Sequence, residues 1–84
     1  MSEIGHAGLD VVEKHNNTAQ TPIHGGLWVA LQCASGTIRL LSASSNTGDD
    51  LGETFMEMGE VIYGNFTSVV NHTDSTGVLL AYRG

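Results

Sequence analysis

The sequence predicts a small all-β domain, an antiparallel β-sandwich or barrel of about five to seven short strands. Two observations indicate this fold class. Short segments rich in β-branched, aliphatic and aromatic residues recur at close spacing along the 84 residues, and eleven glycines separate them. Helix is disfavoured, because its longest candidate, residues 51–61, is interrupted by Gly52 and Gly59. Each of these glycines costs a helix about 1 kcal/mol relative to alanine.

Composition divides the chain into two parts. Residues 1–24 are polar and contain three of the four histidines and the only proline. The one apolar cluster among them, at residues 9–12, is a candidate for a short strand. We therefore expect residues 1–24 to form an N-terminal arm or loosely packed segment. Residues 25–84, which hold nearly all the large apolar side chains, are expected to form the β-domain.

The first strand expected in the β-domain spans residues 27–33. Successive side chains of a strand point to opposite faces, which places Trp28 on one face. The opposite face is then formed by Leu27, Val29, Leu31 and Cys33. Ser35 and Gly36 indicate a turn, and residues 37–43 are expected to complete a hairpin with the first strand.

The remaining strands are expected after a polar loop at residues 44–50. Gly64 and Asn65 are expected to end one short apolar strand before the next begins. Four segments carry the strand pattern, at residues 53–58, 61–63, 66–70 and 78–82.

The charge of the chain argues against two classes of partner. The net charge is −6, and the only lysine and arginine residues are Lys14, Arg39 and Arg83. Three cations are too few to line a nucleic-acid groove or to bind an anionic membrane surface. No apolar run approaches the roughly 20 residues of a transmembrane helix, and the first residues lack the pattern of a signal peptide. We expect synthesis in a cytoplasm, no nucleic-acid binding and no membrane binding.

The histidines and carboxylates do not follow a known metal-binding pattern. His6, His15 and His24 stand nine residues apart and His72 lies far along the chain, whereas zinc sites use short local spacings. The acidic loop at residues 46–53 lacks the alternating order of a calcium loop. We expect solvated side chains and no metal or other cofactor, although a symmetry axis between subunits could gather one histidine from each chain.

Cys33 is the only cysteine, so no disulfide forms within the chain. It alternates with Leu31 and Val29, which favours a buried, inert thiol over a nucleophile. No nucleophile elbow or glycine-rich phosphate loop is present. We expect no catalytic residues and no enzymatic activity.

A domain of this size buries only about 60–65% of its unfolded surface, so oligomerisation or docking on a larger assembly is the natural additional support. Trp28 is either an anchor at a subunit contact or part of a strand buried on both faces, and the sequence leaves both open. The candidate interface residues are Leu9, Val11, Val12, Trp28, Tyr63, Phe66 and Tyr82.

Several segments of residues 25–84 together resemble small virion proteins of tailed bacteriophages. They are, in order, LWVALQ, NTGDD, MGEVIYG, NFTSV and GVLLAYRG. The resemblance implies a short all-β protein, expected as a trimer, that acts as a capsid cement or decoration protein. Its implied partners are the major capsid protein or other virion proteins, and its implied location is the capsid surface. The polar residues 1–24 do not fit the pattern, and no catalytic residue is implied.

Two alternatives remain open at this point. One is a fibre or spike module that binds a host receptor or glycan, for which an exposed aromatic such as Trp28 or Tyr63 beside polar neighbours would form a groove. The other is a small cytoplasmic phage protein that binds a host protein or metabolite. In either virion role, we expect residues 1–24 to contact a neighbouring subunit or the capsid.

Overall fold

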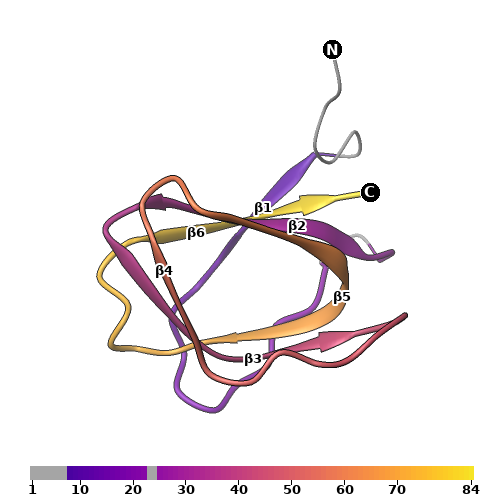
Figure 1. Cartoon of the computed structure of the whole chain (residues 1–84), viewed down its shortest axis with the longest axis horizontal. Coiled ribbons are helices and arrows are strands. Elements are labelled where there is room, and N and C mark those ends of the chain that lie inside the picture. The colour runs from indigo at the N-terminus through magenta and orange to yellow at the C-terminus, as the bar shows by residue number, and fades with distance from the viewer. Residues whose placement is uncertain (1–7, 23–24) are drawn as a thin grey trace.

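Every strand in the part of the chain that the structure describes pairs antiparallel with its neighbours in one sheet, which confirms the all-β prediction. The computed structural model describes residues 8–22 and 25–84. The strands are β1 (Leu9–Val12), β2 (Trp28–Ser35), β3 (Thr37–Ser45), β4 (Thr54–Glu57), β5 (Val61–Asn71) and β6 (Val78–Arg83). Their order in the sheet is β1-β6-β2-β5-β3-β4 (Figure 1). A search of the described residues for a helix long and apolar enough to cross a membrane finds none.

The long strand β5 bends the sheet over a single core. Its first half pairs with β2, and its second half pairs with β3, with Phe66 opposite Trp28 on one side and Ser45 on the other. The sheet therefore folds over at this strand, so that β2 and β6 lie on one side of the core and β3 lies on the other (Figure 1).

The sequence analysis expects β5 to be interrupted at Gly64 and Asn65, but the strand runs through both residues. Gly64 is needed for close packing there, because a Cβ built on it would lie 2.8 Å from Cζ of Phe66. The glycine leaves room for the Phe66 ring at the point where β5 changes partner. Glycine is typical of turns, but at this position inside a strand it is needed because no larger side chain would fit.

Apolar side chains from both halves of the folded sheet fill the core. The register between β2 and its neighbours shifts between Trp28 and Ala30, which marks a β-bulge. The extra residue reverses the alternation, so Trp28 packs in the core with Leu31 and Cys33 instead of facing away from them. The fully buried large side chains include Trp28, Leu31, Ile38, Leu40, Met56, Leu79 and Val69.

The described part of residues 1–24 is packed against residues 25–84. β1 pairs with β6 from Leu9 opposite Tyr82 to Val12 opposite Leu79, and Val12 is only 2% exposed. Further along, Gln20 exchanges two backbone hydrogen bonds of 2.9 Å with Val69 of β5. The alternation of exposed and buried residues in β1 is that of an edge strand with one face on the core.

Buried polar contacts tie this segment to the C-terminal half of the chain. Asn71 is fully buried; its amide Nδ2 donates to the backbone oxygen of Val12 at 3.1 Å, and its Oδ1 accepts a 2.6 Å hydrogen bond from the Ser75 hydroxyl. The backbone N–H of His15 donates to the backbone oxygen of Asn71 at 2.7 Å. These bonds satisfy buried groups that would otherwise oppose folding.

Candidate protein-interaction surface

Two rows of side chains cross the side of the β1-β6-β2-β5 sheet that faces away from the core. Directly paired residues of antiparallel strands project from the same face, so the register defines each row. The first row consists of Leu9, Tyr82, Ala30 and Tyr63, and the second of Val11, Leu80, Gln32 and Val61. With Val78, which precedes Leu80 by two residues on β6, they form what we call the outer face.

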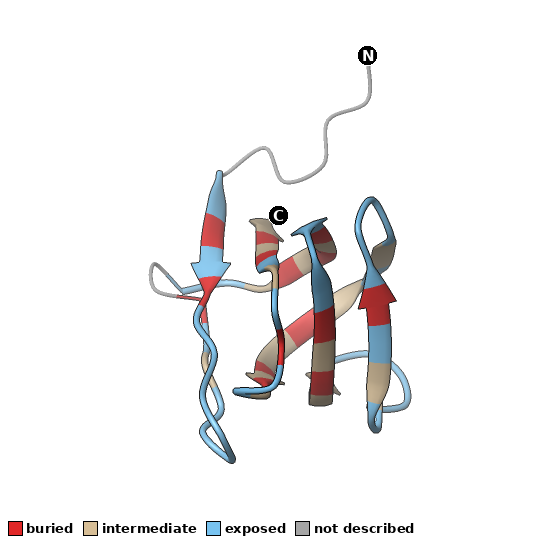
Figure 2. Cartoon of the chain, turned by 90° about the vertical axis from the view of Figure 1, so that its left-hand side faces the viewer, coloured by how far each residue is buried: buried red, intermediate tan, exposed pale blue. Residues whose placement is uncertain are grey.

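The outer face is apolar where a solvent-facing antiparallel sheet ordinarily carries polar residues. Tyr63 is 66% exposed, Val11 57%, Leu9 44% and Val78 41%. Along the strands, buried positions alternate with these exposed or half-buried ones (Figure 2). None of the nine residues carries a formal charge at neutral pH. A contiguous exposed apolar patch on a small protein marks a surface that another molecule covers.

Two polar side chains of the outer face bond to each other within the chain. The Tyr82 hydroxyl donates a hydrogen bond of 2.6 Å to the side-chain oxygen of Gln32, the only non-aromatic polar residue of the face. Ala30, between the two tyrosines of its row, is fully buried. Covering this face with protein would therefore bury little unsatisfied hydrogen-bonding capacity.

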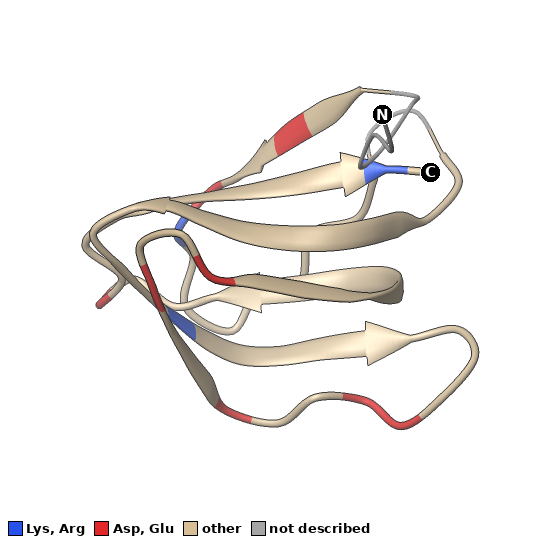
Figure 3. Cartoon of the chain, turned by 45° about the horizontal axis from the view of Figure 1, so that its top comes forward, with Lys and Arg blue, Asp and Glu red and all other residues tan. Residues whose placement is uncertain are grey.

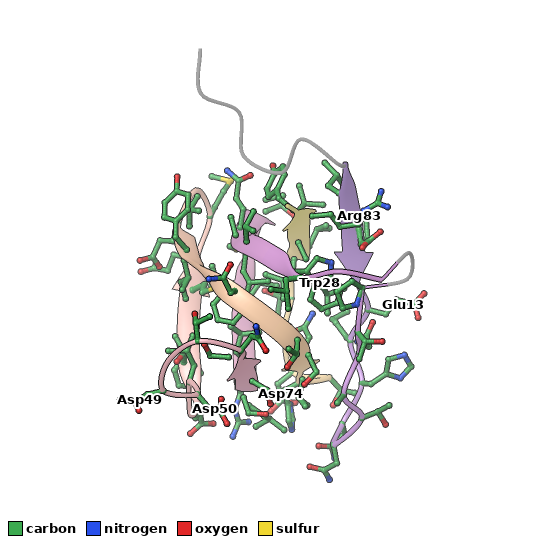
Figure 4. The ribbon with its side chains drawn as sticks, turned by 90° about the vertical axis from the view of Figure 1, so that its right-hand side faces the viewer. Glu13, Trp28, Asp49, Asp50, Asp74 and Arg83 are labelled. Atoms are coloured by element: carbon green, nitrogen blue, oxygen red, sulfur yellow. The ribbon has the colours of Figure 1, made fainter. Side chains whose placement is uncertain are left out.

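The carboxylates of the β3–β4 loop lie away from the outer face, whereas Glu13 follows Val11 by two residues and lines a groove with Val11 and Val78. Asp49 and Asp50 occupy the loop between β3 and β4, at the opposite end of the molecule from Arg83 (Figure 4). Other acidic residues follow that loop and the β4–β5 turn (Figure 3). β3 and β4 contribute no residue to the outer face. The outer face is thus uncharged, whereas β4 and its flanking turns carry carboxylates together with the exposed Phe55 and Met58.

Two arginines are engaged by carboxylates of the chain itself. Arg39 Nε lies 2.7 Å from Glu53 Oε2, and its Nη1 lies 2.9 Å from Asp74 Oδ2. The Glu53 hydrogen bond is the main cause that raises the pKa of the Arg39 guanidinium. Arg83 Nε lies 3.6 Å from Asp10 Oδ2. Neither arginine is therefore placed to bind a phosphate, which fits the low cation content.

A buried polar pair attaches β1 to the core. Trp28 Nε1 donates a hydrogen bond of 2.9 Å to Asp10 Oδ2, and Asp10 is only 8% exposed. Trp28 and Arg83 lie close to β1 in Figure 4, one from β2 and the other from the end of β6. Asp10 thus accepts from Trp28 while it faces the charge of Arg83. This contact sets the position of the strand that contributes Leu9 and Val11 to the outer face.

The structure separates the seven candidate interface residues into two groups. Val12, Trp28 and Phe66 belong to the chain's own core, with exposed fractions of 2%, 1% and 3%. Four others lie on the outer face, namely Leu9, Val11, Tyr63 and Tyr82.

The interface candidates from the sequence did not include the other five residues of the outer face, Ala30, Gln32, Val61, Val78 and Leu80. The alternation in residues 78–82 was the available signal, because Val78, Leu80 and Tyr82 share one side of that strand.

An open groove of about 480 Å³ runs beside the outer face, lined by residues 11–15 and 76–78. Its lining combines Val11, Val12 and Val78 with the polar side chains of Glu13, Lys14 and His15. No aromatic residue lines it. The groove therefore lacks the stacking platform that a sugar-binding site commonly uses.

The residues considered for chemistry do not converge in the described part of the chain. Cys33 is fully buried, and its Sγ lies 3.3 Å from the backbone oxygen of Ser35; desolvation is the main cause that raises its pKa. Residues 8–22 and 25–84 contain no group of three or more His, Cys, Asp or Glu arranged to hold a metal. His6 and His24 lie outside the described residues.

In the acidic loop, Asp50 Oδ1 accepts a 2.7 Å hydrogen bond from the backbone N–H of Ser45. The side chain of Ser45 in turn accepts from the backbone N–H groups of Thr47 and Gly48. These hydrogen bonds close a turn between β3 and β4, in which the side chains of Asp50 and Ser45 bind backbone N–H groups of the loop.

Comparison with known proteins finds no matching family model, no matching curated protein and no matching solved structure.

Proposed function

We propose that this protein is a non-enzymatic structural component of a bacteriophage virion, of the capsid cement or decoration type, and that its outer face contacts protein in the assembled particle. The single observation that carries the proposal is the uncharged apolar outer face across β1, β6, β2 and β5. The resemblance of residues 25–84 to small phage virion proteins supplies the setting.

The size of the face suits repeated weak contacts. Its exposed apolar area is roughly 400 Å², in the range of about 300–600 Å² found for the largest patch on a typical monomer. Burial of that area contributes about 10 kcal/mol at about 25 cal/mol per Å². Association costs about 4–15 kcal/mol, so one such contact alone is weak. On a shell, many identical contacts act together and make weak binding durable.

The acidic surface also suits the exterior of a particle. With a net charge of −6, the chain is repelled by packaged nucleic acid, which is polyanionic. The fibre or spike alternative receives less support from the geometry. Tyr63 is exposed, but it lies on a sheet face beside Ala30, and the groove next to β1 has no aromatic residue.

The test is the protein's presence and attachment in purified particles of the virus that encodes it. Quantitative mass spectrometry should find the chain at a fixed ratio to the major shell protein, and particles lacking it should release their contents at a lower temperature. A chain that stays in the lysate and is absent from mature particles would refute the proposal. Binding to a glycan array by the purified protein would favour the fibre or spike role instead.

Two double variants test the role of the outer face in this attachment. Val11→Glu with Tyr63→Glu places charge on the outer face, and we expect it to lose attachment. Phe55→Glu with Met58→Glu is the matched control, since these side chains are 69% and 70% exposed but lie on β4 and the β4–β5 turn. The control should attach normally, and equal loss by both variants would contradict the assignment of the contact.

A further inference from the structure

We infer that the occupant of the outer face is a second copy of this chain, docked face to face about a two-fold axis. The inference deepens the proposed function, on which its setting in a virion rests, by naming the partner of that surface. A two-fold contact uses the same patch on both chains, so the patch must be compatible with itself. The charge of the outer face, its exposed area and the hydrogen bonds of its polar side chains each support that compatibility.

Charge favours this face for contact between copies. Each copy carries a net charge of −6, so two copies repel over most of their surfaces. The outer face has no Lys, Arg, His, Asp or Glu, and the loop that holds Asp49 and Asp50 is on the β3–β4 side of the molecule (Figure 3). An opposed pair of outer faces therefore keeps the carboxylates of that loop apart and leaves the exposed Glu13 at the edge of the contact, whereas a contact through β4 and its flanking turns would bring loop carboxylates together.

The area matches a weak, reversible pair. The four most exposed side chains of the face are Leu9, Val11, Tyr63 and Val78. With the half-buried Leu80, Tyr82 and Val61, two opposed faces of roughly 400 Å² each remove roughly 800 Å² of apolar surface from water, which is the size of a weak, transient contact. We expect a dissociation constant on the order of 100 μM for the isolated pair.

The face is chemically suited to close contact with its own copy. Tyr63 is a rigid aromatic side chain that is two-thirds exposed, and tyrosine is enriched among the residues that dominate binding. The hydroxyl of Tyr82 and the amide of Gln32 already bond to each other. Their mutual bond pairs the Tyr82 hydroxyl and the Gln32 side-chain oxygen when the centre of the face loses water, and leaves the Gln32 NH2 group to bond across the contact.

Sedimentation velocity on the full chain, from 1 to 500 μM, tests the inference. The wild-type mass is expected to rise with concentration from 8.9 kDa toward twice that value. Val11→Glu with Tyr63→Glu should weaken association at least about 10-fold, because like charges face each other across the axis. Phe55→Glu with Met58→Glu should associate like wild type. The fluorescence of Trp28, the only tryptophan, reports whether each variant is folded.

The outcomes separate this inference from the proposed function. Wild-type chain that remains at 8.9 kDa throughout, or equal weakening in both double variants, overturns the inference. If the chain stays monomeric but only the outer-face variant fails to attach to particles, the face belongs to a shell protein and the proposed function stands. If the pair forms as described but the chain is absent from particles, the proposed function fails and the pair remains.

Discussion

Replacement of Asp10 by alanine tests how β1 is held to the rest of the fold. The carboxylate of Asp10 is almost completely buried; it accepts a 2.9 Å hydrogen bond from Trp28 Nε1 and lies 3.6 Å from Arg83 Nε. Alanine leaves the indole N–H without this acceptor, which costs about 1–3 kcal/mol. It also removes the carboxylate that faces Arg83.

The loss near Arg83 is smaller than for a fully buried pair. The Arg83 side chain is 18% exposed, so water screens part of its charge, and we assign about 1 kcal/mol to this loss. The total expected for Asp10→Ala is about 3 kcal/mol, out of the roughly 4–13 kcal/mol of a domain this size. Asp10→Asn keeps an oxygen that can accept from Trp28 and is expected to lose only about 1 kcal/mol.

Urea denaturation at about 1 μM protein measures these changes, with the emission of Trp28 as the native probe. For a small domain, 3 kcal/mol corresponds to a midpoint lowered by roughly 2–3 M urea. Val11→Ala, on the same strand but 57% exposed, is the control and should lose less than about 1 kcal/mol. An Asp10→Ala midpoint equal to that of the control, or an Asp10→Asn loss as large as that of Asp10→Ala, would show that this contact does not hold β1.

Three further predictions follow from packing and burial. Gly64→Ala should cost about 1–3 kcal/mol in thermal melts because of the clash with Phe66, whereas Gly52→Ala, which meets nothing within 4 Å, should be nearly neutral; equal effects would contradict the packing role. Asn71→Ala should cost about 2 kcal/mol by urea denaturation, since it removes the donor to a buried backbone oxygen of β1 and the acceptor of the 2.6 Å hydrogen bond from Ser75; a loss under about 0.5 kcal/mol would contradict it. The buried Cys33 thiol should react with a thiol reagent only when the protein unfolds. Burial raises the pKa of this thiol, so above about pH 9 the unfolded state releases a proton that the folded state keeps, and the free energy of unfolding should fall as the pH rises. A urea midpoint that is independent of pH in this range, as expected for Cys33→Ala, would contradict the prediction.

Local patterns in the sequence were enough to locate most strands. Residues 78–82 combine β-branched and aromatic side chains between turn signals, and β6 forms there. Residues 37–43 lie within β3 for the same reason. In both segments the preference of the chain and the final structure agree, because the strand needs no information beyond its own side chains and the turns that bound it.

Three features depend on residues distant in sequence and were not predictable from local pattern. The bulge at Trp28 is set by the registers that β2 makes with β5 and β6 at once. β5 continues through Gly64 because the Phe66 ring packs over that glycine. The strand at residues 9–12 was a candidate from the sequence, but its pairing with β6 and the contact between Asp10 and Trp28 were not predictable. In the first two cases tertiary contacts override a local preference.

The outer face illustrates the same limit for the candidate site. Leu9, Val11, Tyr63 and Tyr82 were individually recognisable as candidates, but only the strand order brings them together, because β1 and β5 lie at opposite sides of β6 and β2. Trp28 was also an interface candidate, but the β-bulge between Trp28 and Ala30 turns its side chain into the core. A sequence pattern identifies which side chains are apolar, and the register decides which of them share a surface.

Electron microscopy of the particle that carries this chain tests the central claim most directly. The account predicts density for the domain in the virion, with protein packed against Tyr63 and Val11 across the β1-β6-β2-β5 sheet. An assembled particle in which the domain is present but this face is open to solvent would contradict it.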